Sequence, residues 1–176
     1  PGIDLKLSDG DIFEFGEEEA EILAVPGHTR GHIAYWFRKS AALFCGDTLF
    51  SAGCGRLFEG TPGEMWHSLS RIKRLPPETR IFCAHEYTES NLRYARTVEP
   101  ANQALRAREQ EVKKLRGLGL PTIPSTLSQE ILFNPFLRAD VAAVKTSLGM
   151  PDRDPVEVFA AIRRGKDEFR VHSGLL

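Results

Sequence analysis

Residues 21–47 read EILAVPGHTRGHIAYWFRKSAALFCGD, and this stretch decides the fold class of the chain. Three short apolar runs, at 21–25, 32–37 and 41–46, are rich in β-branched or aromatic residues, and turn-forming or polar residues separate them. A fourth run of the same kind, RIFCA, lies at 80–84. We predict that these four runs are strands of one sheet, with the polar residues at their ends.

The sequence around these strands predicts a hairpin before them and a helix between the third and the fourth. The run LKLSDGDIFEF at 5–15 alternates apolar and polar residues on both sides of Asp9-Gly10, which predicts a hairpin over residues 4–15. TPGEMWHSLSRIKRL follows at 61–75, with Thr61 as N-cap, Pro62 in the first helical position and Glu64 completing a capping box. Strands followed by a helix and another strand indicate an α/β layered unit.

The second half of the chain has a helical pattern. Helices are predicted within 87–98, within 102–119 and from Asp154, the N-cap that precedes Pro155, to about residue 169. Between them, residues 120–138 contain three prolines and predict an extended connection broken by a short helix. We therefore predict a partial α/β domain at 1–97 and a helical, substrate-binding domain at 98–176.

Composition excludes several classes of protein. Lys and Arg total 23 against 24 Asp and Glu, so the net charge of -1 gives no overall attraction to nucleic acid or to a membrane surface. No run approaches the roughly 18 apolar residues of a transmembrane helix. The three cysteines fit neither a disulfide framework nor a CxxC pair, which favours a reducing compartment, the cytoplasm.

Three polar residues at the ends of predicted strands could carry chemistry. His28 follows EILAVPG, Asp47 follows AALFCG and His85 follows RIFCA. Strand ends meet at one edge of a sheet, and imidazoles with a carboxylate are ligands that Zn²⁺, Mn²⁺ or Fe ions accept. The alternative stays open that each histidine is a hydrogen-bonding cap and that Asp47 closes a turn.

Five blocks of sequence carry a resemblance to a known family. These blocks are PGHTRGHIAYW (26–36), LFCGDTLFSAGCGRLFEGT (43–61), CAHEYTESNLRYA (83–95), TLSQEILFNPFLR (126–138) and RRGKDEF (163–169). In their order and spacing they closely resemble glyoxalase II, the hydroxyacylglutathione hydrolase branch of the metallo-β-lactamase superfamily. The resemblance extends from about residue 8 to residue 169.

The resemblance implies a fold, two metal ions and a reaction. The fold class is α/β: the C-terminal portion of a four-layer αββα sandwich, followed by a mainly helical domain. The reaction is hydrolysis of S-D-lactoylglutathione to glutathione and D-lactate by a metal-bound hydroxide, with two divalent ions, zinc first and iron or manganese as alternatives. By motif position, His28 would ligate one metal, His85 the other and Asp47 both, whereas His32 would be a structural hydrogen-bonding partner near the site.

The resemblance also assigns a binding surface for the glutathione part of the substrate. By motif position, the substrate-binding residues would be Arg56, Phe58, Tyr87, Arg163 and Lys166. Some family members have tyrosine where this chain has Phe58, so one hydroxyl donor is absent. Without the resemblance, the basic residues of RRGK would be read as a solvated helix face.

One family motif does not occur in this sequence. The T-H-x-H-x-D-H segment, which supplies most of the family's metal ligands, is absent, and the histidines are at 28, 32, 67, 85 and 172. We therefore expect this chain alone to be inactive and to hold at most one ion, poorly. We also expect exposed apolar sheet surface that another segment, a partner chain or an oligomer covers. The alternative function is a non-catalytic remnant that binds glutathione conjugates or a protein partner.

Overall fold

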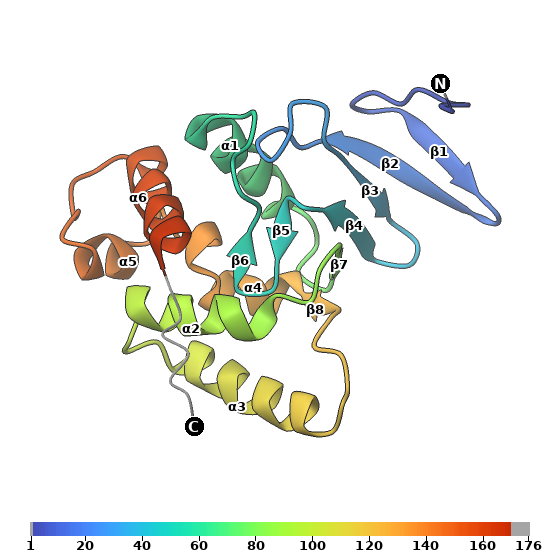
Figure 1. Ribbon diagram of the computed structural model, residues 1–176. Helices are drawn as coiled ribbons and strands as arrows, with labels where there is room; N and C mark the ends of the chain where they lie inside the picture. Colours follow the sequence, from blue (N-terminus) through green and yellow to red (C-terminus); the bar gives the residue numbers. More distant parts are fainter. Residues whose placement is uncertain (1, 170–176) are drawn as a thin grey trace.

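The computed structural model describes residues 2–169, so the segment VHSGLL at 171–176, to which no motif assigns a role, lies outside the described residues. A six-stranded sheet in the order β1-β2-β3-β4-β7-β8 forms the main layer (Figure 1). Its strands are β1 (Ile12–Phe15), β2 (Glu18–Ala24), β3 (Ile33–Phe37), β4 (Ala42–Gly46), β7 (Arg80–Cys83) and β8 (Ser125–Thr126). A separate hairpin consists of β5 (Leu49–Phe50) and β6 (Gly53–Cys54).

The strand directions bring three strand ends to one edge of the sheet. β2 is antiparallel to β3, and β3 is antiparallel to β4, so β2 and β4 run in the same direction. β4 and β7 pair in parallel. The loops that follow β2, β4 and β7 therefore leave the sheet at the same edge.

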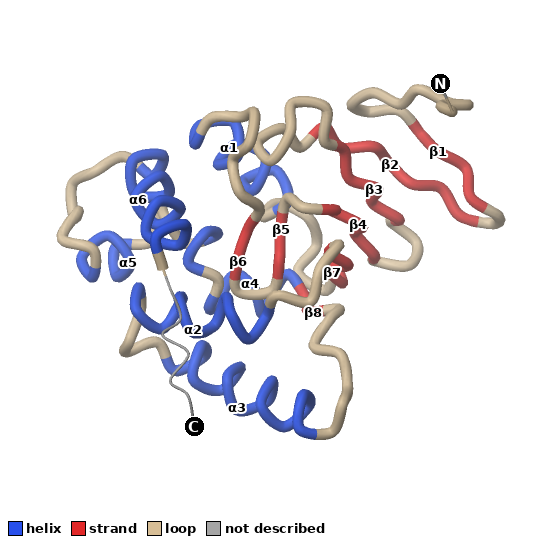
Figure 2. The backbone as a smooth tube through the Cα atoms, viewed as in Figure 1, coloured by secondary structure: helices blue, strands red, loops and turns tan. Residues whose placement is uncertain are grey.

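The helices lie mainly on one side of the sheet and beyond it (Figure 2). They are α1 (Pro62–Ile72), α2 (Thr88–Val98), α3 (Gln103–Gly117), α4 (Leu127–Phe133), the 3₁₀ turn η1 (Pro135–Leu137), α5 (Ala142–Ser147) and α6 (Pro155–Glu168). The predicted capping box of Thr61 and Glu64 is confirmed, and so is the Asp154 N-cap of α6. Within residues 2–169, no helix has the length and apolar character needed to cross a bilayer.

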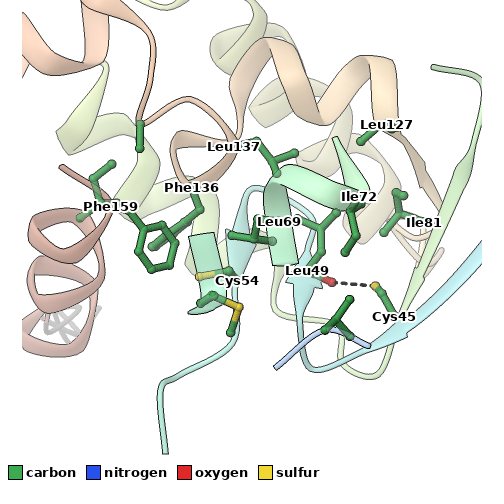
Figure 3. Packing of buried hydrophobic residues seen from close by; sticks show 14 of the residues in the cluster. Cys45, Leu49, Cys54, Leu69, Ile72, Ile81, Leu127, Phe136, Leu137 and Phe159 are labelled. Carbon is green, nitrogen blue, oxygen red and sulfur yellow. Dashed lines mark hydrogen bonds between the residues drawn. The ribbon is translucent and has the colours of Figure 1, made fainter. Parts of the chain in front are cut away.

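One face of the sheet packs into the main core. Leu43 on β4 and Ile81 on β7 are fully buried and pack with Leu69 and Ile72 of α1. The same cluster continues through Phe136 and Phe159, so α6 and η1 share a core with the sheet (Figure 3). The burial of this apolar surface fixes the sheet against the helices whose residues surround the strand ends.

The opposite face of the sheet carries aromatic side chains. These line a groove of about 710 Å³ and come from β1, β3, β4 and β7: Phe13, Phe15, Tyr35, Phe37, Phe44 and Phe82. Phe15 is 67% exposed and Phe44 46% exposed. The expected exposed apolar sheet surface is therefore present, and its coverage by another segment, a partner chain or an oligomer stays a prediction.

The predicted hairpin over residues 4–15 is wrong. β1 pairs with β2, not with the residues before Asp9. Gly10 does adopt a positive φ of 83°, but Leu5 is 59% exposed, so no burial holds a strand in that segment. Asp9 instead accepts hydrogen bonds from the Ala24 N–H at 2.7 Å and from Arg71 Nη1 at 2.8 Å, which attach the turn to the end of β2.

Candidate functional site

His28, Asp47 and His85 follow β2, β4 and β7 and meet at the shared edge of the sheet. His28 Nε2 lies 3.9 Å from Asp47 Oδ2, and His85 Nε2 lies 3.3 Å from Asp47 Oδ1. The carboxylate therefore lies between the two imidazoles and presents one oxygen to each. The predicted convergence of the three strand ends follows from the shared direction of their strands, although the metal-binding role of these residues stays a prediction.

His28 is oriented by the main chain of a neighbouring loop. Its Nδ1 lies 2.9 Å from the carbonyl oxygen of Arg56, to which the Nδ1–H donates. The bond leaves Nε2 as the ring nitrogen on the side that faces Asp47. Metal-binding histidines commonly use such a bond to a backbone carbonyl to fix the ring.

His32 is confirmed as a structural hydrogen-bonding partner near the site. The backbone N–H of Asp47 donates to His32 Nε2 at 3.0 Å. Burial lowers the pKa of His32, and the neighbouring His28 lowers it further. A neutral His32 is consistent with this contact, because Nε2 must be unprotonated to accept the bond.

Gly55 allows the two loops that carry His28 and Asp47 to approach each other. A Cβ on Gly55 would lie 1.9 Å from the carbonyl oxygen of Asp47 and 3.3 Å from His28 Cβ. No side chain fits at the first distance unless the backbone moves. The glycine of the GCGR block is therefore required by the close approach to Asp47.

We expect Gly55→Ala to lower the free energy of unfolding by about 1–3 kcal/mol, because the added methyl group must displace main chain. Gly31→Ala is the control, since a Cβ there meets nothing within 4 Å. Thermal unfolding of both variants measures the difference. Equal stability of the Gly55 and Gly31 variants would contradict the close contact.

A pocket of about 510 Å³ opens beside Asp47 and is lined by all the predicted site residues. Its lining consists of His28, Asp47, Phe50, Cys54, Gly55, Arg56, Phe58, His85, Tyr87, Ser90, Asn91, Arg163 and Lys166. These residues come from the loops after β2, β4 and β7, from the β5–β6 hairpin and from helices α2 and α6. The pocket thus joins the strand ends to the helical half of the chain.

The helical wall of the pocket is cationic. Lys166 Nζ donates to the backbone oxygen of Ser90 at 2.9 Å, which links α6 to α2. Burial is the main cause that lowers the pKa of Lys166 to about 8, together with the positive charges of Arg163, Arg93 and Arg56, whereas Asp167 opposes this shift. A carboxylate ligand would stabilise the charged form of this lysine, which burial and the neighbouring arginines disfavour.

Arg163 binds other groups of the protein and thereby stabilises the helical wall of the pocket. Its Nη1 donates to the carbonyl oxygen of Cys54 at 2.9 Å, and its Nη2 pairs with Asp167 at 2.9 Å. Its guanidinium also lies over the Phe136 ring, 5.1 Å from the ring centroid. Arg163 is only 5% exposed, so its first effect is to attach α6 to β6.

The remaining walls are aromatic. The Tyr87 ring stacks on His85 with centroids 4.9 Å apart, and the Phe58 ring lies 4.9 Å from that of His28. Tyr87 is 50% exposed and Phe58 is 68% exposed, so both present apolar surface at the mouth of the pocket. These contacts also restrict the ring orientations of the two histidines.

Ser90, Asn91 and Asp167 are among the site residues that the sequence analysis missed. Ser90 and Asn91 line the pocket, and Asp167 holds Arg163 and lies 3.7 Å from Arg56 Nε. Ser90 and Asn91 lie two and three residues after the HEYT block, and their position in the first turns of α2 was the available signal. The role of Asp167 depends on a contact across the fold, which no local pattern reveals.

The three strand-end residues have the chemistry and orientation to bind a divalent cation, but they do not form a complete three-ligand site by themselves. Two imidazoles flank one carboxylate, and the His28 ring is held with Nε2 toward that carboxylate. A catalytic zinc site needs three protein ligands around one ion. Within residues 2–169, no group of three His, Cys, Asp or Glu side chains is close enough together to form such a site.

The cysteines near the site are poor nucleophiles. Cys45 and Cys54 are buried, and burial raises the pKa of both thiols, that of Cys54 to about 11. Because the thiolate is the reactive form, neither is prepared for nucleophilic attack near neutral pH.

Family models match both halves of the chain. The model of the metallo-beta-lactamase superfamily matches residues 1–85, and that of the hydroxyacylglutathione hydrolase C-terminus matches residues 86–169. Among solved structures, ETHE1 from Myxococcus xanthus has a TM-score of 0.59 at 20% identity, covering 93% of this chain and 52% of that one. The BLEG-1 B3 metallo-beta-lactamase has a TM-score of 0.52 at 24% identity, covering 76% and 48%. These likenesses confirm the expected metallo-β-lactamase fold.

Two curated relatives carry the same name. Hydroxyacylglutathione hydrolase from Methylococcus capsulatus is 56% identical over 170 residues, which cover 97% of this chain and 66% of that protein. The protein of the same name from Microcystis aeruginosa is 53% identical over 174 residues, which cover 96% and 67%. The chain thus spans about two thirds of the length of these relatives. By this identity and coverage, the chain belongs to the hydroxyacylglutathione hydrolase family of the metallo-β-lactamase superfamily.

Proposed function

We propose that this chain contributes the substrate pocket and part of the metal centre of a thioester hydrolase that converts S-D-lactoylglutathione to glutathione and D-lactate. The observation that carries the proposal is the single pocket where Asp47, between two histidines, faces a cationic wall that includes Lys166. In a substrate with a thioester at one end and carboxylates at the other, the thioester would lie at Asp47 and the histidines and the carboxylates at the cationic wall. The names of the relatives support the same reaction.

His28, Asp47 and His85 would hold the metal ions of the complete protein. The family implies divalent metals, and we propose zinc, with iron or manganese as alternatives. A divalent cation there would supply the Lewis acidity that ionises water near neutral pH and polarises the thioester carbonyl. The chain's own contribution is orientation: Arg56 O fixes the His28 ring, and His32 holds the backbone of Asp47.

The glutathione part of the substrate would lie along the helical wall. We assign its carboxylates to Lys166 and Arg56, which line the pocket, with Arg163 supporting Arg56 through Asp167. Tyr87 and Phe58 would cover the apolar part of the ligand near the two histidines. Residues 98–176, of which 98–169 are described, would form the substrate-binding helical domain, because α6 lies in this region and supplies Lys166.

The proposal is tested by thioesterase assays on two proteins. One is this chain, and the other is a protein of the relatives' full length that contains this sequence. We expect the full-length protein to release glutathione thiol from S-D-lactoylglutathione and to lose this activity in chelator, while this chain alone shows no turnover. A metal-loaded full-length protein that leaves the thioester intact would overturn the substrate assignment.

A second candidate function is binding of glutathione conjugates without catalysis. The observation that favours it is that Lys166, Arg56 and Tyr87, none of which is a proposed metal ligand, line the pocket. Titration of this chain in chelator with S-methylglutathione, a stable thioether, separates the two functions. Saturable binding by a full-length protein that never hydrolyses the thioester would favour the binding function, and no binding by either protein would remove it.

We also propose a cytoplasmic location. Cys45, Cys54 and Cys83 are free thiols, as expected in a reducing compartment. Measurement of free thiols in protein isolated under alkylating conditions tests this, with all three cysteines expected to be labelled after denaturation.

A further inference from the structure

The turn between β5 and β6 is buried, whereas most turns lie on the protein surface. Ser51 and Ala52 connect the two strands and are 1% and 0% exposed. Ala52 also has a positive φ of 57°, a conformation that side chains other than glycine rarely adopt. A buried turn must find partners for its backbone groups within the protein, because water cannot reach them.

Three side chains supply these partners. Glu130 Oε2 accepts a hydrogen bond from the Ala52 N–H at 2.9 Å. Asn134 Nδ2 donates to the carbonyl oxygens of Phe50 at 3.1 Å and Gly53 at 3.0 Å, and it also lies 3.0 Å from Glu130 Oε2. From the opposite side, Asn91 Nδ2 donates to Ser51 O at 3.1 Å. Four consecutive residues of the turn are thus held by side chains of other elements.

The turn lies between two walls of the pocket. Phe50 precedes it and places its ring 5.4 Å from that of Tyr87 and 6.2 Å from that of His85. Gly53 and Cys54 follow it and lead directly to Arg56. Any displacement of the turn therefore moves an aromatic wall and a cationic residue together.

We propose that Glu130 and Asn134, from the block TLSQEILFNPFLR, are positioning residues that hold the β5–β6 turn and thereby set Phe50 and Arg56 for substrate binding. This inference rests on the proposed function, and neither residue touches the pocket. Both side chains are fully buried. Each reaches the substrate only through the turn, so its effect is on geometry and not on chemistry.

The carboxyl group of Glu130 is fully buried. Glu130 is 0% exposed, and within residues 2–169 it forms no ion pair. Its second oxygen, Oε1, has no hydrogen-bond partner there. Burial raises the pKa of this carboxyl group. A glutamine, neutral and of the same shape, can keep the bond to the Ala52 N–H, whereas a leucine cannot.

The test compares Glu130→Gln, Glu130→Leu and a control, Val144→Ala, which opens the fully buried core beneath α5 away from the pocket. Titration with S-methylglutathione is expected to give a Kd close to that of the unchanged chain for Glu130→Gln and for Val144→Ala. Glu130→Leu is expected to raise the Kd about tenfold, because the buried Ala52 N–H loses its hydrogen-bond partner and the turn shifts. Equal Kd values for Glu130→Leu and Val144→Ala would overturn the inference.

A second measurement separates this inference from the proposed function. The ring-proton NMR shifts of His85 and Tyr87 respond to the Phe50 ring without any ligand. We expect Glu130→Leu to change these shifts and Glu130→Gln to leave them in place. Unchanged shifts in Glu130→Leu would overturn the inference even if the chain binds S-methylglutathione. Changed shifts in a chain that does not bind S-methylglutathione would contradict only the proposed function.

Discussion

Asp47→Asn is expected to lower kcat of the full-length protein by about a thousandfold. Asp47 is the carboxylate between the two histidines, and asparagine keeps its shape while removing the negative charge that would attract a cation. Metal-assisted catalysis contributes several kcal/mol, and a loss of about 4 kcal/mol corresponds to this factor in rate. Thioesterase assays together with metal analysis of the purified variant measure both consequences.

The matched control for this prediction is Asp140→Asn. Asp140 pairs with Lys73 at 2.8 Å on the surface, so the same chemical change occurs there outside the pocket. This control should keep its metal content and its kcat, because exposed ion pairs contribute little. An Asp47→Asn protein with the metal content and kcat of the control would contradict the role of Asp47.

Lys166→Met is expected to raise the Kd of this chain for S-methylglutathione by about 10-fold to 100-fold at pH 7. Hydrogen bonds to charged groups contribute about 1.5–3 kcal/mol, which corresponds to this range in affinity. Calorimetric titration measures the effect. Lys113→Met is the control, because Lys113 is exposed on α3 and should not alter the Kd. A normal Kd in the Lys166 variant would remove this residue from the binding site.

The affinity should also depend on pH through Lys166. Folding lowers its pKa from 10.5 to about 8, so the folded chain releases this proton as the pH rises through 8. The Kd should therefore increase above pH 8, and Lys166→Arg should suppress the increase because arginine stays charged. The same shift affects the free energy of unfolding, because the unfolded chain binds the Lys166 proton more tightly than the folded chain. With respect to this group, the protein is most stable above pH 10.5, loses stability as the pH falls toward 8 and shows no further change below 8.

The sequence predicts where the central strands end better than it predicts the edges of the sheet. The apolar runs that precede His28, Asp47 and His85 were sufficient to locate the strand ends. A buried strand consists of apolar residues, so polar residues occur where the strand ends. The helices with capping residues, at Thr61 and Asp154, were predicted for a similarly local reason. Local chemistry decided each of these elements.

What the sequence did not predict depends on contacts between distant residues. The strands β5 and β6 have two residues each, and their turn is stable because Glu130 and Asn134, far along the chain, bind it. β8 is equally short and exists through its pairing with β7. Arg163 matched a ligand-binding position by motif, but its bonds to Cys54 and Asp167 could be found only in the fold.

The central claim is that the loops after β2, β4 and β7 bring two imidazoles and a carboxylate together at the metal centre of the full-length protein. The most direct measurement is an anomalous-scattering map, at the zinc absorption edge, from crystals of the zinc-loaded full-length protein. The account predicts a zinc peak in coordination contact with Asp47 and with the Nε2 atom of His28 or His85. A map in which zinc binds elsewhere, with all three side chains free, would contradict it.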